Sequence, residues 1–370
     1  METRALSFAE RRDWLRLHRT ATVGPVAFRD LLARYKTASA ALEALPNIVR
    51  RKGLSIPPLT AIEAELQQCE HWGIQMLASC EPDYPAYLRA VDPVPPIIAV
   101  KGRLDILHKP CVAIVGSRNA SAIAQRFARQ LASELGAQGY TIVSGLARGI
   151  DTAAHHGSLE SGTAGVLGGG VDHIYPRQNA ELFRDISERG ALISESPLGY
   201  KATARDFPRR NRIISGLCQG VIVVEAAEKS GTLITARYAM EQNREVMAVP
   251  GSPLDPRSKG CNRLIQNGAA LIESCDDVID VLNHVAPLRF KEPGPDDYHA
   301  EFDYEAAQEQ IKTAKAALLN LLSPTATSRD ELIRLSGLPI PIAQAALLEM
   351  ELSGDAHVEA DGRMALSLNS

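Results

Sequence analysis

The segment Phe207–Leu217 brings an aromatic side chain, three arginines and an asparagine together and then continues as an apolar helical pattern. Arg209, Arg210 and Arg212 would lie in the first turns of this helix, where the helix dipole favours acidic side chains. The cations therefore indicate a ligand outside the helix, and the phosphates of a nucleotide or nucleic acid suit such a cluster. A solvated basic turn that only pairs with neighbouring acids is the alternative.

Four turns rich in glycine, most of them with hydroxyl side chains, each follow an apolar, β-branched run. Glycine lets a phosphate approach the backbone closely, serine and threonine donate hydroxyl hydrogen bonds, and arginine or lysine adds charge. Each turn alone could cap a helix, but the four turns and the arginine cluster together predict an anion-binding site. The turns are Gly116–Ser117–Arg118, Ser144–Gly145–Leu146–Ala147–Arg148–Gly149, Gly168–Gly169–Gly170 and Lys229–Ser230–Gly231–Thr232.

The sequence argues against several cofactor sites. No G-x-G-x-x-G follows the first predicted strand, and the second ends in Ser144 with no acid for a ribose hydroxyl, so we expect no dinucleotide cofactor. A G-x-x-x-x-G-K-[ST] loop for ATP is missing too. The six cysteines form no C-x-x-C pair, which predicts reduced, buried thiols and no metal site. With neither a signal-peptide pattern nor a long apolar run, we expect a soluble, cytoplasmic protein.

The overall charge is slightly acidic, with 40 Lys and Arg against 44 Asp and Glu, a net charge of -4. A nucleic-acid function must therefore rest on local basic clusters and not on a global field. The length of 370 residues predicts two to four compact units.

The central part of the chain alternates short β-branched runs with helical patterns. Such alternation predicts an α/β fold, a doubly wound, mostly parallel Rossmann-like sheet with helices on both faces. Ligands of such sheets bind beyond the carboxyl ends of the strands. The expected strands include 97–100, 112–115, 141–143, 164–167, 192–193, 221–224 and 246–249, and the expected helices include 122–136 and 232–242.

Smaller domains are expected on either side of a sheet domain at 76–286. Apolar residues at helical spacing predict a small helical domain in residues 1–75. Its turn Val23–Gly24–Pro25 could belong to a helix-hairpin-helix that offers amides to a DNA phosphate. We favour a plain corner between two helices, because the turn has no lysine or arginine.

A polar segment rich in proline and acids, 287–310, predicts a linker. The remaining residues, 311–370, predict a winged-helix domain of three helices and a hairpin with an Asp361–Gly362 turn. Its recognition helix would be Ala343–Leu352. This helix is poor in base-reading side chains, so a protein-contact or structural role is at least as well supported as DNA reading.

The central motifs resemble the DprA/Smf family, the DNA-processing proteins of bacterial natural transformation. The resemblance covers about residues 80–285, and the flanks fit a sterile-alpha-motif-like (SAM-like) helical domain and a winged-helix domain. It implies that the protein catalyses no reaction, binds single-stranded DNA, forms a homodimer and helps to load RecA recombinase while displacing or coexisting with single-strand-binding protein. The motifs are Gly116–Arg118, Ser144–Asp151 with His155, Gly168–Gly170, Tyr175–Pro176 with Asn179, Ile193–Glu195, Phe207–Leu217, Glu225–Ala226, Ser230–Ala236 and Ala248–Gly251.

The expected site grips successive phosphates with cations, amides and hydroxyls, while Phe207 stacks on a base. Such contacts predict slight sequence preference and strong salt dependence. The candidate residues are Gly116, Ser117, Arg118, Ser144, Gly145, Arg148, Phe207, Arg209, Arg210, Asn211, Arg212, Lys229, Ser230, Gly231 and Thr232.

Two other classes of function remain open. Nucleotide phosphoribohydrolases of similar architecture carry a catalytic glutamate in P-G-G-x-G-T-x-x-E, where this chain has Thr235. We expect Glu195 and Glu225 to orient neighbouring arginines, and Asp151 to cap the helix that follows it. The third class is a regulator that binds duplex DNA through the winged helix.

The implied homodimer also has a candidate interface. The segments Asn262–Ile265 and Ala270–Ile272 offer apolar side chains near a predicted sheet edge, where a two-fold contact could bury them.

Overall fold

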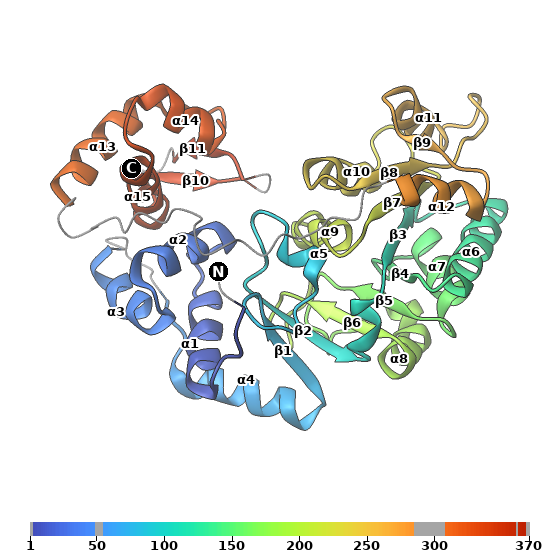
Figure 1. Cartoon of the computed structure of the whole chain (residues 1–370), viewed down its shortest axis with the longest axis horizontal. Helices are drawn as coiled ribbons and strands as arrows, with labels where there is room; N and C mark the ends of the chain where they lie inside the picture. Colours follow the sequence, from blue (N-terminus) through green and yellow to red (C-terminus); the bar gives the residue numbers. More distant parts are fainter. Residues whose placement is uncertain (1–2, 49–54, 285–307, 360–361, 368–370) are drawn as a thin grey trace. The chain divides into compact units, whose positions relative to one another are not determined.

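The computed structural model describes residues 3–48, 55–284, 308–359 and 362–367. The chain divides into two compact units. One contains residues 1–5 and 64–288, and the other contains residues 6–63 and 289–370. Figure 1 shows the sheet of the first unit and the mainly helical second unit.

The first unit is built on a nine-stranded sheet with the strand order β1-β2-β6-β5-β4-β3-β7-β8-β9. Strands β3 to β9 pair in parallel, whereas β2 is antiparallel to both β1 and β6. The strands are β1 (Ile74–Ala78), β2 (Ile97–Gly102), β3 (Cys111–Gly116), β4 (Thr141–Ser144), β5 (Thr163–Val166), β6 (Ala191–Ser194), β7 (Gly220–Val224), β8 (Glu245–Ala248) and β9 (Ala270–Leu271).

Helices cover both faces of the sheet (Figure 1). On one face lie α5 (Ala86–Arg89), α9 (Asp206–Gly216), α10 (Thr232–Glu241) and α11 (Lys259–Gln266). On the other lie α6 (Ala122–Ala137), α7 (Ile150–Ser158), α8 (Ala180–Arg189) and α12 (Cys275–His284). The unit also contains α4 (Leu59–His71), which begins in the other unit, and the short 3-10 helices η1 (Asp105–His108) and η2 (Arg177–Asn179).

Strand β3 shows why the central strands are continuous apolar runs in the sequence. Val112 and Ile114 belong to the apolar cluster that contains α6 and α7, whereas Ala113 and Val115 belong to the cluster that contains α9 and α10. Every residue of β3 is buried, because helices cover both faces. The doubly wound, mostly parallel sheet is thus confirmed.

The order of the strands places the topological switch point of the sheet between β3 and β7. From β3 the chain proceeds outward to β4, β5 and β6, and then returns to β7 on the other side of β3. The helices that follow β3 and β7, α6 and α10, cover opposite faces. Loops therefore diverge at this carboxyl edge, where open α/β sheets bind ligands.

The second unit contains two small groups of elements. The first is α1 (Phe8–His18), α2 (Pro25–Tyr35) and α3 (Ala38–Ile48). The second is α13 (Gln308–Leu321), α14 (Arg329–Ser336) and α15 (Ile340–Ser353), followed by the antiparallel strands β10 (Ala356–Val358) and β11 (Met364–Leu366). Three helices and a hairpin confirm the winged-helix prediction.

Two expected features fall on residues outside the described ranges. Most of the linker expected at 287–310 lies there, and α13 begins at Gln308, inside its last part. Asp361 of the expected hairpin turn also lies outside. The other turn residue, Gly362, has φ 83°, a conformation that glycine adopts without a steric penalty.

Helix α15 contains the expected recognition segment, and it is buried on nearly every side. Its residues Ile342, Ala346 and Met350 belong to the winged-helix core. Leu348 and Leu352 lie outside that core cluster but are also buried, and α15 packs against α2 and α3 as well as α13.

Ion pairs join the same helices. Arg34 of α2 lies 3.1 Å from Glu349 of α15, and Arg329 contacts both Asp30 of α2, at 2.8 Å, and Glu351 of α15, at 3.0 Å. In this arrangement α15 packs against protein and does not present a free face to a DNA groove.

Candidate nucleic-acid interface

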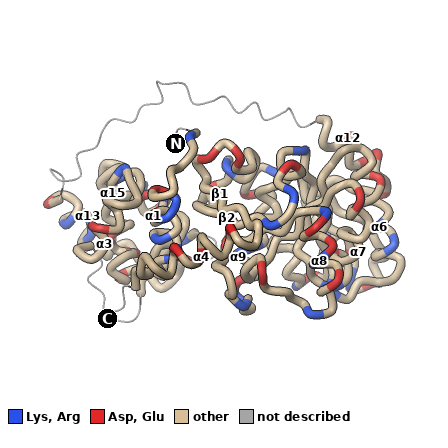
Figure 2. The backbone as a smooth tube through the Cα atoms, turned by 90° about the horizontal axis from the view of Figure 1, so that it is seen from below, with Lys and Arg blue, Asp and Glu red and all other residues tan. Residues whose placement is uncertain are grey.

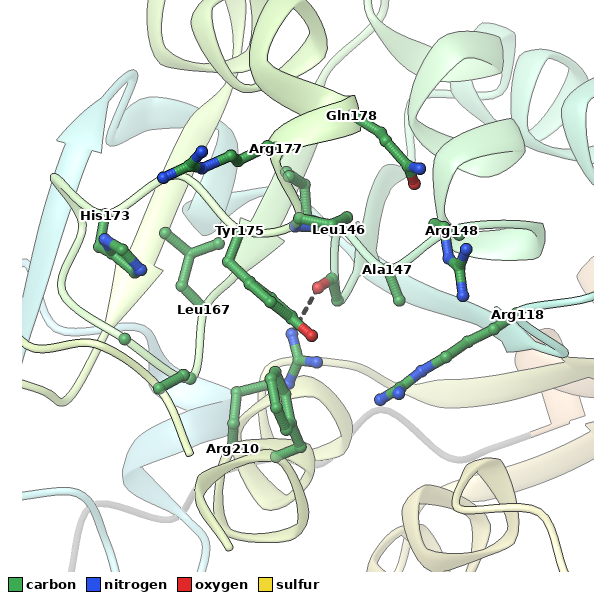
Figure 3. Close-up of a pocket in the computed structure, with 16 residues that line it drawn as sticks. Arg118, Leu146, Ala147, Arg148, Leu167, His173, Tyr175, Arg177, Gln178 and Arg210 are labelled. Carbon is green, nitrogen blue, oxygen red and sulfur yellow. Dashed lines mark hydrogen bonds between the residues drawn. The ribbon is translucent and has the colours of Figure 1, made fainter. Parts of the chain in front are cut away.

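A cavity of about 330 Å³ lies at the carboxyl edge of the sheet, beside β4 and β5. Its lining residues include four arginines and one histidine, and contain neither aspartate nor glutamate. Figure 3 shows these side chains converging from separate segments of the chain. The lining residues come from Arg118 after β3, Gly145–Arg148 after β4, Leu167–Gly169 after β5, the segment His173–Gln178, Ala202, and Phe207 and Arg210 of α9.

Aromatic rings and guanidinium groups stack at the mouth of this pocket. The Arg118 guanidinium lies 5.5 Å from the centre of the Phe207 ring, and that of Arg210 lies 5.9 Å from it. The ring of Tyr175, a residue that is 49% exposed, is tilted against Phe207 with centroids 5.5 Å apart. Flat, partly exposed surfaces beside cations are what a nucleobase and its phosphate require.

Arg210 is a buried wall of the pocket and not a free surface cation. Only 6% of the residue is exposed, and its Nη1 donates to the carbonyls of Gly145, at 2.6 Å, and Val166. Burial lowers the pKa of Arg210 to about 10, although Asp151 opposes this shift. Arg210 therefore stays charged at neutral pH, so it can brace the turns after β4 and β5 and supply positive potential to the pocket.

The other members of the basic cluster do not line the pocket. Arg212 forms an ion pair with Glu195, at 2.6 Å, and donates to the carbonyl of Pro93. The structure thus corrects the expectation that Arg212 is available to phosphate, and it confirms that Glu195 orients an arginine. Arg209 is exposed and Asn211 is half-buried, both on α9 and outside the lining.

The role of Asp151 differs from the helix-capping role that we expected. Its Oδ2 accepts hydrogen bonds from the amides of Gly145 and Ala147, both at 3.2 Å, so it caps the turn that precedes α7. Burial raises the pKa of Asp151, while Arg210 and these hydrogen bonds lower it.

The turns after β3 and β7 form a separate group beside the pocket. The Thr232 hydroxyl donates to the carbonyl of Gly116, at 3.0 Å, and the Ser230 hydroxyl donates to Thr232. Lys229 and Gly231 are exposed. These expected site residues lie together at the carboxyl ends of β3 and β7, and Arg118 belongs to the turn that follows β3.

Other predicted residues at this edge form hydrogen bonds with groups of the protein itself. The Ser144 hydroxyl is fully buried and donates to the carbonyl of Ile114, at 2.6 Å, so it does not face a ligand. Ser117 accepts from the amide of Asn119. Glu225 accepts from the amide and hydroxyl of Ser121, so this carboxylate supports the start of α6.

Four polar or aromatic lining residues are not among the expected site residues: His173, Tyr175, Arg177 and Gln178. They lie between the glycines that follow β5 and the start of α8. In the sequence, the feature that could have indicated their place in the site is a tyrosine, an arginine and a glutamine close to a glycine turn. Their place at the pocket depends on how this loop returns across the edge of the sheet.

Several residues and helices bear on enzymatic, metal-binding and membrane functions. Thr235, which replaces the catalytic glutamate of the phosphoribohydrolase motif, is only 2% exposed in α10. Within the described ranges, no group of three or more His, Cys, Asp or Glu residues could hold a metal ion. None of the described helices has the length and apolar character needed to cross a membrane.

Charge is distributed in both signs along the chain. In Figure 2 segments with lysine or arginine alternate with segments that carry aspartate or glutamate. The positive character of the pocket is therefore a local property of its lining residues.

Comparisons with sequence families match three parts of the chain. Residues 75–283 match the family described as DNA recombination-mediator protein A, residues 8–67 match a DprA-like N-terminal HHH domain, and residues 303–362 match a DprA winged helix domain. The abbreviation HHH denotes helix-hairpin-helix, so the second match corrects our preference for a plain corner at Val23–Gly24–Pro25.

Curated relatives support the same assignment. Protein Smf of Escherichia coli K12 is 38% identical over 300 residues, which cover 80% of this chain and 79% of the relative. DNA processing protein DprA of Bacillus subtilis 168 is 44% identical over 213 residues, which cover 57% of this chain and 72% of the relative.

Two solved structures are also similar. DNA processing protein A of Streptococcus pneumoniae aligns with a TM-score of 0.63 and 32% identity, over 76% of this chain and 98% of that one. The Helicobacter pylori protein, described for its unique single-stranded DNA binding mode, aligns with a TM-score of 0.53 and 28% identity, over 58% of this chain and 97% of that one. The chain thus belongs to the DNA recombination-mediator protein A, or DprA/Smf, family of DNA-processing proteins.

Proposed function

We propose that this protein binds single-stranded DNA with little sequence preference, protects the strand and helps to load RecA recombinase onto it during natural transformation and recombination. The observation that carries the proposal is the pocket, in which four arginines surround two partly exposed aromatic rings without an acidic side chain. The single-stranded DNA binding mode described for the Helicobacter pylori relative supports the same kind of ligand.

The pocket contacts favour phosphates and base faces over base edges. Arginines contact the backbone of any sequence, and aromatic rings stack on any base. Affinity for single strands should therefore fall by about 0.7 log units per log unit of salt for each phosphate neutralised. Fluorescence anisotropy with labelled oligothymidylate, a mixed-sequence strand and a duplex, each at several salt concentrations, tests this. Equal affinity for the duplex, or a binding constant independent of salt, would contradict the proposal.

The two competing functions are tested in the same preparation. A phosphoribohydrolase would release free base from nucleoside monophosphates, and the buried Thr235 at the glutamate position speaks against this activity. A regulator that reads duplex DNA through α15 would need a free helix face, whereas Leu348 and Leu352 of α15 are buried. Base release, or tight sequence-specific duplex binding, would favour the corresponding alternative.

RecA loading is part of the proposal because the resemblance to the DprA/Smf family names RecA. A protein that binds a single strand without catalysing a reaction needs a recipient for that strand. The protein should accelerate RecA assembly on a strand already coated with single-strand-binding protein. The assay measures ATP hydrolysis by RecA at increasing ratios of this protein to DNA. An unchanged lag at every ratio would count against the proposed partner.

We also propose a homodimer through the β9 edge of the sheet. Leu271 of this edge strand is 47% exposed, whereas Leu264 packs against the core, so Leu271→Arg is the informative substitution. Light scattering should give twice the 40.0 kDa chain mass for the wild type and a smaller mass for the variant. A wild-type monomer would refute the dimer, and a dimeric Leu271→Arg protein would refute this interface.

A further inference from the structure

The turn after β4 has an unusual backbone that the surrounding structure must hold. Leu146 has φ 58°, which is uncommon for a residue other than glycine. Its side chain is fully buried in the apolar cluster that contains α8. Such a backbone conformation persists only where several contacts from the surrounding structure hold it in place.

Three buried or half-buried side chains engage every carbonyl oxygen of the Gly145–Ala147 turn. Arg210 donates to the oxygen of Gly145, at 2.6 Å. Asn179 donates to the oxygen of Leu146, at 2.9 Å, and Thr152 donates to the oxygen of Ala147, at 2.8 Å. These oxygens, which would repel a phosphate, are therefore paired with donors from the protein.

Asn179 is the centre of this arrangement. It is 7% exposed, and its Nδ2 also donates to the Thr152 hydroxyl, at 2.9 Å. The side-chain amide of Asn179 thus holds the Leu146 carbonyl directly. It also holds the Thr152 hydroxyl, which in turn donates to the Ala147 carbonyl. An aspartate at this position has the same shape when ionised but cannot donate either bond.

Asn179 also connects two walls of the pocket. It ends η2, the short helix that begins with Arg177 and directly follows Tyr175 and Pro176. A second part of the lining is the turn that leads to Arg148, whose Leu146 and Ala147 lie beside Tyr175 in Figure 3. The hydrogen bond from Asn179 to Leu146 therefore ties the aromatic wall to the turn that carries Arg148.

Asp151 acts on the same turn from its amide side. Its Oδ2 accepts from the amides of Gly145 and Ala147, so two amides of the turn are held as well as its three carbonyls. We propose that Asn179 and Asp151 are positioning residues of the pocket, which hold the Gly145–Ala147 turn with its carbonyl oxygens withdrawn from the ligand and with Arg148 in place for a phosphate. This inference rests on the proposed binding of single-stranded DNA.

The test compares Asn179→Asp with Thr141→Val. Thr141 lies at the other end of β4 and donates from a buried position to the carbonyl of Ile106, at 2.8 Å, so its variant loses one buried hydrogen bond away from the pocket. We expect Asn179→Asp to weaken binding of labelled oligothymidylate by about tenfold, and Thr141→Val to leave it unchanged. Asn179→Ala replaces Asn179→Asp if the latter does not fold.

A double-mutant cycle separates positioning from general destabilisation. In an Arg148→Ala background the effect of Asn179→Asp should shrink to about threefold or less, whereas in a Lys229→Ala background it should persist in full. Equal effects in both backgrounds would overturn the proposal, because the loss would then not act through Arg148.

Hydrogen exchange of the free protein tests the clamp without DNA. The amides of Gly145 and Ala147 should exchange faster in Asn179→Asp than in wild type, while Thr141→Val leaves their rates unchanged. Unchanged rates in Asn179→Asp would overturn the proposal whatever the binding result. If the wild type binds no oligothymidylate, the proposed function fails, and the exchange rates still decide whether Asn179 holds the turn.

Discussion

Arg210 and Asp151 hold the same residue from opposite sides: Arg210 donates to the carbonyl of Gly145, at 2.6 Å, and Asp151 accepts from its amide, at 3.2 Å. A buried cation and a buried carboxylate therefore share one turn and compensate each other's burial. The pocket takes its positive potential from a group that the fold also needs. The consequences of removing a pocket arginine should thus depend on which arginine is removed.

Arg210→Ala should destabilise the fold and weaken DNA binding together. The substitution leaves the carbonyls of Gly145 and Val166 without their donor and Asp151 without its cation. We expect a loss of about 3 kcal/mol in the free energy of unfolding. Denaturant unfolding measures this loss. A variant as stable as the wild type would show that Arg210 does not brace the two turns.

Arg118→Ala should weaken binding without a comparable loss of stability. Arg118 is exposed, and its guanidinium lies over the Phe207 ring. The free energy of unfolding should change by less than about 0.5 kcal/mol. The salt slope of binding should flatten by about 0.7, the share of one phosphate on a single strand. Arg237, an exposed arginine of α10 that pairs with Glu241, provides the matched control. A similar flattening in Arg237→Ala would contradict a local site.

Phe207→Ala should cost about 1–3 kcal/mol in binding free energy while leaving the salt slope nearly unchanged, because stacking involves no counterion release. Trp72→Ala removes a 40% exposed aromatic of the same unit that lies outside the pocket lining. Titrations at two salt concentrations distinguish the effects. If both variants lose the same affinity, stacking on Phe207 is not part of binding.

His155 should make the folded state less stable in mild acid. The residue is fully buried, its Nδ1 lies 2.7 Å from the Thr163 hydroxyl, and burial first, then His156 and Arg210, lower its pKa from 6.5 to about 3. Below pH 6.5 the His155 imidazole binds a proton in the unfolded chain, whereas in the folded chain it stays neutral down to about pH 3. Stability conferred by the neutral ring is therefore lost as the pH falls through this window.

The size of this effect is about 2 kcal/mol between pH 7 and pH 5. The unfolding free energy of wild type and of His155→Gln, measured by denaturant at both pH values, should differ in pH dependence by that amount. His156→Gln, at the exposed neighbour, is the control. An identical pH dependence in wild type and His155→Gln would refute the assignment.

The sequence by itself determined the central architecture. Strands such as Val112–Val115 are continuously apolar because helices bury both faces, and this pattern is visible without coordinates. Glycine turns after those strands had to meet at one edge, because carboxyl ends of parallel strands share an edge. The winged helix and the burial of the cysteines followed from local patterns in the same way.

Only the tertiary structure decided which cations face the pocket. Arg209, Arg210 and Arg212 are neighbours in sequence, but helical geometry and packing separate them into an exposed residue, a buried pocket wall and the partner of Glu195. The same holds for Asn179, whose role depends on a contact with Leu146 across 33 positions of the chain. Local patterns record residue type and periodicity, whereas the partner of a buried polar group is fixed by the packing of distant segments, and that packing made this pocket.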